Sequence, residues 1–277
     1  CGNRIQKVLE VEPSMENGSK ECIEEKRTPA NAVDFNHVSL TYSGAGAPSL
    51  TDIDLHVKTG QTIGIIGGTG SGKTSVVNLI PRFYDVTEGQ VMVDGMDVRE
   101  YKITDLRDKI GIVPQKAVLF AGTVRSNLAW GKEDATEEEM QQALSVAQAA
   151  EVVDKKDGKL DAEVEQGGKN FSGGQKQRLT IARALVKQPE ILIMDDSSSA
   201  LDYATDAKLR QAIHNMPSRP TVFIVSQRAA SIMYADKIIV LDDGTVAGTG
   251  THEELLKDCS VYQEIYYSQF KRTEGGH

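Results

Sequence analysis

The sequence is poor in cysteine, has fewer basic than acidic residues and contains no long hydrophobic run. Its three cysteines, Cys1, Cys22 and Cys259, are too few and too scattered for a disulfide framework or a zinc site, so a reducing compartment is expected. The longest apolar runs, such as residues 191–194, are far too short to span a bilayer. The sequence therefore predicts neither a transmembrane helix nor a signal peptide.

The charge balance is acidic, because 31 Lys and Arg stand against 40 Asp and Glu, a formal net charge of −9 over 277 residues. Nucleic-acid binders usually present a basic face, so no nucleic-acid partner is expected. A content of 39% hydrophobic and 26% charged residues is typical of a globular protein with an ample core. The histidines at positions 37, 56, 214, 252 and 277 lack metal-ligand spacing and are expected on the surface or in loops.

Hydrophobic patterning divides the chain into segments. Residues 1–30 are polar with proline and glycine breakers, which predicts a linker, with the end of a helix over 4–10. Alternating apolar and polar residues predict half-exposed strands over 37–42 and 51–57. Asp94-Gly95 predicts a hairpin within 90–98. Short apolar runs predict further strands, over 62–66, 110–113, 191–194, 221–225 and 237–241.

Residues 124–187 have a helical pattern and are expected to form an inserted helical region. Thr136 with Glu139 predicts a capping box. One apolar stripe follows it, at positions 140, 143, 144, 147 and 150. A second helix over 175–186 is stopped by Pro189, and Thr251 with Glu254 caps a C-terminal helical tail, about 251–277. Strands alternating with helices predict an α/β fold built on a parallel sheet.

The strand over 62–66 leads directly into a glycine-rich loop, Gly67-Gly68-Thr69-Gly70-Ser71-Gly72-Lys73-Thr74 followed by Ser75, which fits G-x-x-x-x-G-K-[ST]. Glycines let the backbone curl so that several N–H groups point at phosphate oxygens. Lys73 would place a positive charge on the β and γ phosphates, and the Thr74 hydroxyl would ligate Mg²⁺. A strand before the loop and an apolar helix after it favour a nucleotide site over a chance glycine-rich turn.

Two downstream segments make the sequence resemble an ABC ATPase. Phe171-Ser172-Gly173-Gly174-Gln175 is similar to the signature motif, and residues 191–196 resemble the Walker B strand. The resemblance covers nearly everything from Val33 onward and is closest to the nucleotide-binding domains of ABC exporters. In that family transmembrane helices precede the ATPase on one polypeptide, which would explain a chain that begins at Cys1. The resemblance thus implies a P-loop NTPase domain over 31–277, with a RecA-like core, an antiparallel β-subdomain and a helical subdomain over about 124–187.

The resemblance also implies cofactors, partners and residue roles. ATP and Mg²⁺ would bind between two ABC domains arranged head to tail, at the cytoplasmic face of a membrane and beneath their transmembrane domains. Ser172, Gly173, Gly174 and Gln175 would cap the γ-phosphate held by the other domain. Within its own site, Asp195 and Gln115 would contact Mg²⁺ and Tyr42 would stack on adenine. Asp202 would lie in a D-loop over 199–202, and residues 163–168 loosely resemble the exporter X-loop.

Two departures from the family pattern change the expected function. The general base after the Walker B aspartate is normally glutamate; Asp196 withdraws the carboxylate by roughly 1.5 Å, and a misplacement of about 1 Å can lower a rate about 10²-fold. The switch-loop histidine is replaced by Gln227, which can hydrogen-bond a γ-phosphate but cannot carry positive charge or relay a proton.

The chain thus combines intact ATP-binding residues with weakened hydrolytic residues. This combination resembles the degenerate half of a heterodimeric exporter. Such a half hydrolyses ATP slowly at its own site, while its signature completes the site of a different, consensus-type partner. Two alternatives stay open: a homodimeric exporter with two slow sites, and a soluble ABC ATPase of DNA maintenance. The second is disfavoured by the acidic charge and by the lack of sustained heptads or a C-x-x-C pair.

Overall fold

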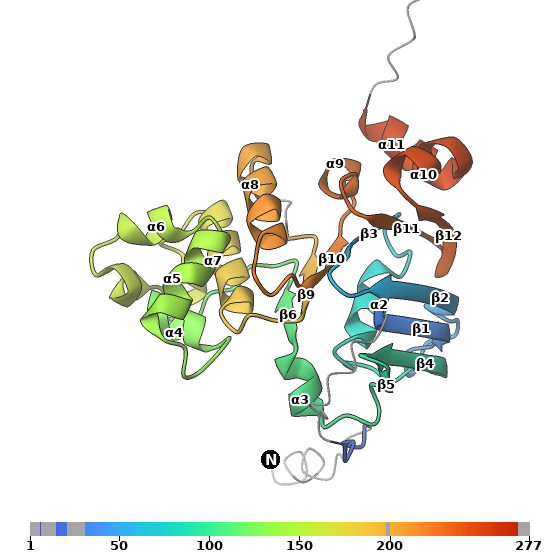
Figure 1. Cartoon of the computed structure of the whole chain (residues 1–277), viewed down its shortest axis with the longest axis horizontal. Coiled ribbons are helices and arrows are strands. Elements are labelled where there is room, and N and C mark those ends of the chain that lie inside the picture. Colours follow the sequence, from blue (N-terminus) through green and yellow to red (C-terminus); the bar gives the residue numbers. More distant parts are fainter. Residues whose placement is uncertain (1–5, 7–14, 21–30, 198–199, 271–277) are drawn as a thin grey trace, which may run out of the picture.

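The protein contains a six-stranded sheet, whose β6, β9 and β10 lie in the middle of the molecule, and a four-stranded sheet at one side of it (Figure 1). The computed structural model describes residues 6, 15–20, 31–197 and 200–270. The six-stranded sheet has the order β12-β11-β3-β10-β9-β6, and its strands are β3 Thr62–Gly67, β6 Ile110–Val113, β9 Ile191–Asp195, β10 Thr221–Val225, β11 Lys237–Asp242 and β12 Thr245–Gly250. All neighbours pair in parallel except β11 and β12, so the predicted α/β class with a parallel core is confirmed.

The four-stranded sheet is antiparallel and forms the predicted β-subdomain. Its strands, in the order β2-β1-β4-β5, are β1 Asn31–Leu40, β2 Leu50–Lys58, β4 Glu88–Val93 and β5 Met96–Asp97. The turn between β4 and β5 is the predicted Asp94-Gly95, and both residues have positive φ, as such hairpin turns require. Helix α2 (Lys73–Leu79) packs between the two sheets, since its Val76, Val77 and Leu79 share one apolar cluster with both.

Side chains of the six-stranded sheet alternate between two cores. Ile191 and Ile193 of β9 face the cluster that contains α2, whereas Leu192 and Met194 face the cluster that contains the larger helices. A sheet buried on both faces accounts for its nearly continuous apolar strands. This packing fixes the carboxyl ends of the parallel strands, where ligands of open α/β sheets bind.

The region 124–187 contains four helices, which lie to one side of the sheets (green and yellow in Figure 1): α4 Val124–Ala129, α5 Glu137–Val146, α6 Ala150–Asp154 and α7 Gly173–Leu185. The Thr136–Glu139 capping box is confirmed. The predicted apolar stripe over 140–150 was too long at its C-terminal end. Gln148 adopts φ 57° and ends the helical run, so Ala150 belongs to α6. The region is also less purely helical than expected, since β8 (Glu163–Val164) pairs with β7 (Gly122–Thr123) beside two 3₁₀ turns, η1 Lys159–Asp161 and η2 Gln166–Gly168.

Three helices were not predicted: α3 Ile103–Asp108, α8 Tyr203–His214 and α9 Ala229–Ile232. The C-terminal helices are α10 His252–Asp258, which begins at the predicted Thr251–Glu254 capping box, and α11 Ser260–Gln269. The histidines at 37, 56 and 214 are exposed at the surface, as predicted, whereas His252 is half-buried against Tyr262.

Several predictions fall on residues that the structure does not describe. The helix end over 4–10, most of the 1–30 linker, Cys1, Cys22 and the end of the tail with His277 lie outside the described residues. Within the described ranges, no helix combines the length and the apolar character that crossing a bilayer requires.

Candidate functional site

A cleft of about 650 Å³ opens at the carboxyl ends of β3, β9 and β10. Strand ends of a parallel sheet are where ligands gather, and the strand that precedes the phosphate loop (residues 67–74) leads into this edge. Ten of the predicted site residues line the cleft: Thr69, Gly70, Gly72, Lys73, Thr74, Ser75, Gln115, Asp195, Asp196 and Gln227. Segments more than 150 residues apart in sequence, from Thr69 to Gln227, therefore meet at one place.

The side chain of Lys73 curls back into the phosphate loop. Its Nζ donates to the carbonyl of Gly67 at 3.0 Å, to the carbonyl of Gly68 and to Ser71 Oγ at 3.4 Å. Burial lowers the pKa of the Lys73 ammonium, and the neighbouring carboxylates of Asp195 and Asp196 oppose that shift. The loop thus holds a positive charge inside its own curve, which suits an anionic ligand.

Two glycines of the loop are required by close packing. A Cβ on Gly67 would lie 2.2 Å from the carbonyl oxygen of Leu241. Gly72 has φ 95°, and a Cβ there would approach Leu50 Cδ2 to 2.6 Å. A side chain at position 67 would displace the strand that contains Leu241, and one at position 72 would be strained by the left-handed φ, so both positions favour glycine.

Thr74 and Asp195 meet across the floor of the cleft. Thr74 Oγ1 donates to the two carboxylate oxygens of Asp195, at 3.3 and 3.2 Å. Burial raises the pKa of the Asp195 carboxyl and the charge of Asp196 raises it further, while the Thr74 hydrogen bond opposes both. A hydroxyl and a carboxylate side by side are hard oxygen ligands, which is the donor chemistry that Mg²⁺ prefers.

Asp196 stands one residue beyond β9, in a left-handed conformation with φ 43°. Its N–H donates to the carbonyl of Val225 at the end of β10, at 2.8 Å. Gln115 Nε2 donates to Asp196 Oδ2 at 3.4 Å. Burial raises the pKa of the Asp196 carboxyl, and the Gln115 hydrogen bond and the charge of Lys73 oppose the shift. The structure therefore brings Gln115, from the end of β6, and Asp196 into contact.

Tyr42 lies next to the cleft but not among the residues that line it. Its hydroxyl donates to Ser75 Oγ at 2.9 Å, and Ser75 is itself a lining residue. The Tyr42 ring meets the ring of Tyr84 edge-on, with centroids 4.8 Å apart. Stacking of Tyr42 on adenine stays a prediction.

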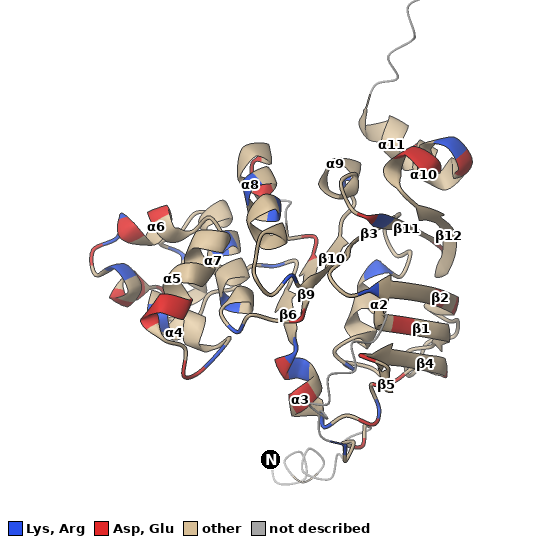
Figure 2. Ribbon diagram, in the orientation of Figure 1, with Lys and Arg blue, Asp and Glu red and all other residues tan. Residues whose placement is uncertain are grey.

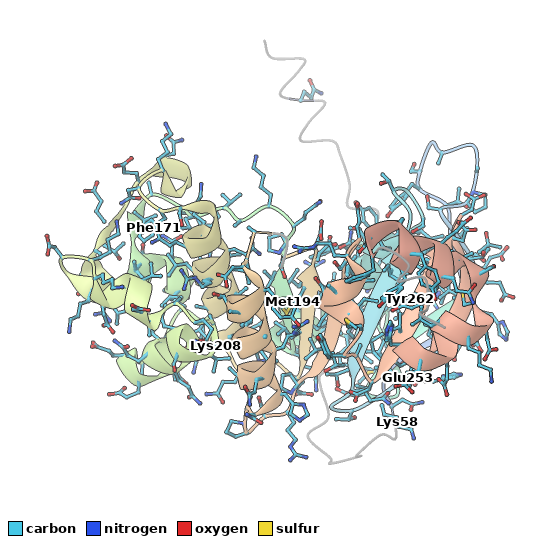
Figure 3. All side chains as sticks on the ribbon, turned by 90° about the horizontal axis from the view of Figure 1, so that it is seen from above. Lys58, Phe171, Met194, Lys208, Glu253 and Tyr262 are labelled. Atoms are coloured by element: carbon cyan, nitrogen blue, oxygen red, sulfur yellow. The ribbon has the colours of Figure 1, made fainter. Side chains whose placement is uncertain are left out.

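The signature segment, Ser172–Gln175, lies apart from the residues that line the cleft. Ser172 is the N-cap of α7: its Oγ accepts from the N–H of Gln175 at 3.3 Å, and Gln175 Oε1 accepts from the N–H of Ser172 at 2.9 Å. Ser172 and Gly173 are exposed. Figure 3 labels the neighbouring Phe171 among the helices and Met194 of β9 at the centre of the molecule.

Asp202 also lies away from the described lining residues. It caps α8, because its Oδ1 accepts from the N–H of Thr205 at 2.9 Å and its Oδ2 from the Thr205 hydroxyl at 2.7 Å. These hydrogen bonds hold the pKa of the Asp202 carboxyl below its usual value. Ser199, in the same predicted D-loop, lies outside the described residues.

The sequence analysis missed the rim of the cleft, which is built by the β1–β2 loop, the turn after β11 and the residue after β10: Ala45, Ala47, Pro48, Ser49, Ser226, Asp243 and Gly244. The N–H of Thr51, at the start of β2 next to that loop, donates to the carbonyl of Gly244 in the turn at 2.9 Å. The available signal was the run of small residues after Tyr42, since small side chains let a ligand approach the backbone closely.

Comparison with known proteins shows that the chain is similar to them over most of its length and not at single motifs alone. The family described as ABC transporter matches residues 50–199. An uncharacterized ABC transporter ATP-binding protein of Mycobacterium tuberculosis is 45% identical over 284 residues, which cover 100% of this chain and 48% of that protein. A putative multidrug export ATP-binding/permease protein of Staphylococcus aureus is 40% identical over 237 residues, or 86% of this chain and 41% of that protein.

A solved structure shows the same similarity in three dimensions. A bacterial Atm1-family ABC exporter with ATP bound superposes with a TM-score of 0.87 and 32% sequence identity, over 97% of this chain and 47% of that one. The chain thus spans about half the length of the relatives that it matches.

Proposed function

Because the chain belongs to the ABC transporter family, we propose that it is the ATP-binding domain of an exporter, in which ATP binding and hydrolysis drive transport across a membrane. The observation that carries the proposal is the convergence of Lys73, Asp195, Asp196 and Gln227 on one cleft. The similarity to a multidrug export protein and to an exporter structure supports export. In this proposal residues 1–30 are a linker from a transmembrane domain, residues 31–277 are the ATPase domain with its helical subdomain, and the domain lies at the cytoplasmic face of the membrane.

The residues of the cleft divide the work of an ATPase. Backbone N–H groups of the phosphate loop and the Lys73 ammonium bind the phosphates and neutralise their charge. Thr74 and Asp195, with Gln115 beside them, would hold Mg²⁺, which when bound neutralises charge on the phosphate oxygens. Asp196 accepts the proton of the attacking water, and Gln115 and Gln227 orient the water and the γ-phosphate.

A second ABC domain completes the site in this proposal. Ser172 and Gly173 are exposed at the start of α7, where a hydroxyl and helix N–H groups suit a phosphate. A Cβ built on Gly173 would meet no described atom within 4 Å, so the described chain offers no steric reason for a glycine there. Close approach of a partner's nucleotide supplies that reason, and the partners proposed are another ABC domain and the transmembrane domains of both.

We further propose that this chain is the degenerate half of a heterodimer. The support is chemical: Asp196 holds its carboxylate one methylene short of a glutamate, and Gln227 cannot carry the charge of a histidine. The homodimer with two slow sites is the alternative, and a co-assembled partner with glutamate and histidine at these positions would exclude it.

A DNA-maintenance ATPase is favoured less. Figure 2 shows Lys and Arg interspersed with Asp and Glu along the described ribbon rather than gathered on one face, whereas DNA binding needs a basic surface. The longest described helix, α7, has 13 residues, so the described part of the chain contains no long coiled-coil arm.

The proposal predicts that Lys73→Ala in the complete protein weakens ATP binding or turnover about 10- to 100-fold, because it removes the ammonium that faces the phosphates. Lys208→Ala is the matched control, since it removes an exposed lysine from α8. ATP titration and phosphate release measure both variants. Equal affinity and turnover in wild type and Lys73→Ala would overturn the nucleotide-site assignment.

A further inference from the structure

We propose that Gln269, the last residue of α11, is a positioning residue for the switch loop, defined as residues 226–228. In this inference Gln269 fixes the loop backbone so that the side chain of Gln227 faces the cleft. The inference rests on the proposed function, in which Gln227 contacts the γ-phosphate of ATP.

One side-chain amide makes two hydrogen bonds to the backbone at this loop. Gln269 Nε2 donates to the carbonyl of Gln227 at 2.7 Å, and Gln269 Oε1 accepts from the N–H of Ala229 at 2.9 Å. The two bonds also fix which way the amide points, because exchanging its oxygen and nitrogen would set donor against donor and acceptor against acceptor. The two bonds thus hold the peptide groups on both sides of Arg228.

The second bond supplies a cap that α9 otherwise lacks. The first N–H groups of a helix have no partner within the helix and usually bond to the side chain of the N-cap residue. Arg228 occupies that position in α9 and makes no such bond, because a guanidinium has donors and no acceptor. Gln269, 40 residues further along the chain, provides the missing acceptor for the N–H of Ala229.

Two further hydrogen bonds hold the loop on either side of Gln227. The N–H of Ser226 donates to the carbonyl of Ile65 in β3 at 3.0 Å, and the N–H of Arg228 donates to Ser226 Oγ at 3.0 Å. The carbonyl of Gln227 is held by Gln269. Because Gln227 lines the cleft, a rotation of its peptide group would move its side chain relative to a bound phosphate.

Helix α11 gives Gln269 a rigid base. Tyr262 is fully buried, and its hydroxyl lies 2.8 Å from Nδ1 of His252 in α10. Figure 3 labels Tyr262 on the side of the molecule opposite Phe171. One turn further along α11, the ring of Tyr266 stacks on Phe270 with centroids 4.6 Å apart, and both pack against the main core. The end of α11 that carries the Gln269 amide is therefore fixed by packing against the core.

The chain offers a matched control on the same helix. Gln263 Nε2 donates to the carbonyls of Leu256 and Lys257 at 2.8 and 3.2 Å. Gln263→Ala and Gln269→Ala each delete two hydrogen bonds from an amide side chain to the backbone. The hydrogen bonds of Gln269 include one to the switch loop, whereas those of Gln263 stay at residues 256 and 257.

The test uses the complete transporter and reads nucleotide affinity at this chain alone, by displacing photoreactive azido-ATP with ADP or with a non-hydrolysable ATP analogue. Gln269→Ala is expected to weaken the analogue about fivefold and to leave ADP within about twofold, because a γ-phosphate contact distinguishes the two nucleotides. Amide hydrogen exchange of residues 226–232 should become faster. Gln263→Ala should change neither readout, and a parallel loss of ADP affinity in Gln269→Ala, or behaviour like that of Gln263→Ala, would overturn the inference.

Gln227→Ala separates this inference from the proposed function. If Gln227→Ala retains full preference for the analogue over ADP, the γ-phosphate role of Gln227 is wrong and both fail. If Gln227→Ala loses the preference and Gln269→Ala keeps it, the role of Gln269 fails alone. When both hold, the double variant is expected to be no weaker than Gln227→Ala, since the two residues act through one contact.

Discussion

Ser172→Ala in this chain is expected to lower the steady-state ATPase rate of the assembled pair about 10²- to 10³-fold, which is the usual effect of losing a donor to a transition-state oxygen. In the proposed head-to-tail dimer the Ser172 hydroxyl faces the γ-phosphate of the partner's competent site. Asp196→Ala, by contrast, disables the site that the proposal holds to be slow already, so a loss of about twofold is expected in the same assay. If Asp196→Ala is the more damaging variant, this chain carries the working site and the degenerate-half assignment is wrong.

Ser172 also caps α7, and losing a cap destabilises a protein by about 1 kcal/mol. Gly173→Ala separates the two roles, because its added methyl group would meet no described atom of this chain within 4 Å. It should therefore not lower the unfolding temperature, since alanine is favoured over glycine in a helix, and it should still lower turnover of the pair. Gly174→Asp is more severe but less clean, since a Cβ there would lie 3.2 Å from the carbonyl oxygen of Ala200. Normal turnover of Gly173→Ala would contradict the role of the signature.

The parts of the fold that could be predicted are those encoded within a few residues. The strand Ile110–Val113 was predicted to the residue, since its short apolar run is followed directly by a proline, which ends it. The caps Thr136–Glu139 and Thr251–Glu254 are likewise local. Helix α8 was missed because its apolar pattern is weak: Leu209 and Ile213 are its buried apolar residues, and packing against the rest of the domain stabilises it.

The residues of the site likewise divide into those that a local motif predicts and those that packing between distant segments brings together. The phosphate loop is one continuous motif, so its residues could be named from the sequence, whereas the rim at Ser49 and Gly244 arises from packing between segments far apart in the chain. No motif predicts that Gln269 bonds to a loop residue 42 positions before it. The left-handed φ of 43° at Asp196 was also not predictable, although aspartate adopts that region more readily than most residues.

The conformation of Asp196 bears on an attempt to restore hydrolysis. Its N–H is tethered to Val225 at the end of β10, so the position of its Cα is set by the sheet and a longer side chain would extend from the same point. A non-glycine residue in the left-handed region costs about 1–2 kcal/mol, and aspartate offsets part of that by local hydrogen bonding. Glutamate is therefore expected to lower stability slightly while it lengthens the reach of the carboxylate.

Asp196→Glu combined with Gln227→His is expected to raise ATP turnover at this chain's site by about 10²-fold or more. Glutamate restores the reach of the base, where about 1 Å decides about 10²-fold in rate, and a protonatable switch residue restores help in proton transfer worth about 10²- to 10⁴-fold. The backbone at residue 227 is held by Gln269, so the histidine side chain would start from the same place as the glutamine that it replaces.

The measurement of this gain needs a pair in which the partner's phosphate-loop lysine is replaced by alanine, so that turnover comes from this chain's site. The matched control is Asp196→Gln with Gln227→His, which has the shape of the gain variant but no base and should stay as slow as wild type. A double variant no faster than this control would show that these two side chains are not what limits the site. Closure of the dimer would then be the candidate for the slow step, because the phosphate loop, Thr74 and Asp195 are the same in all three proteins.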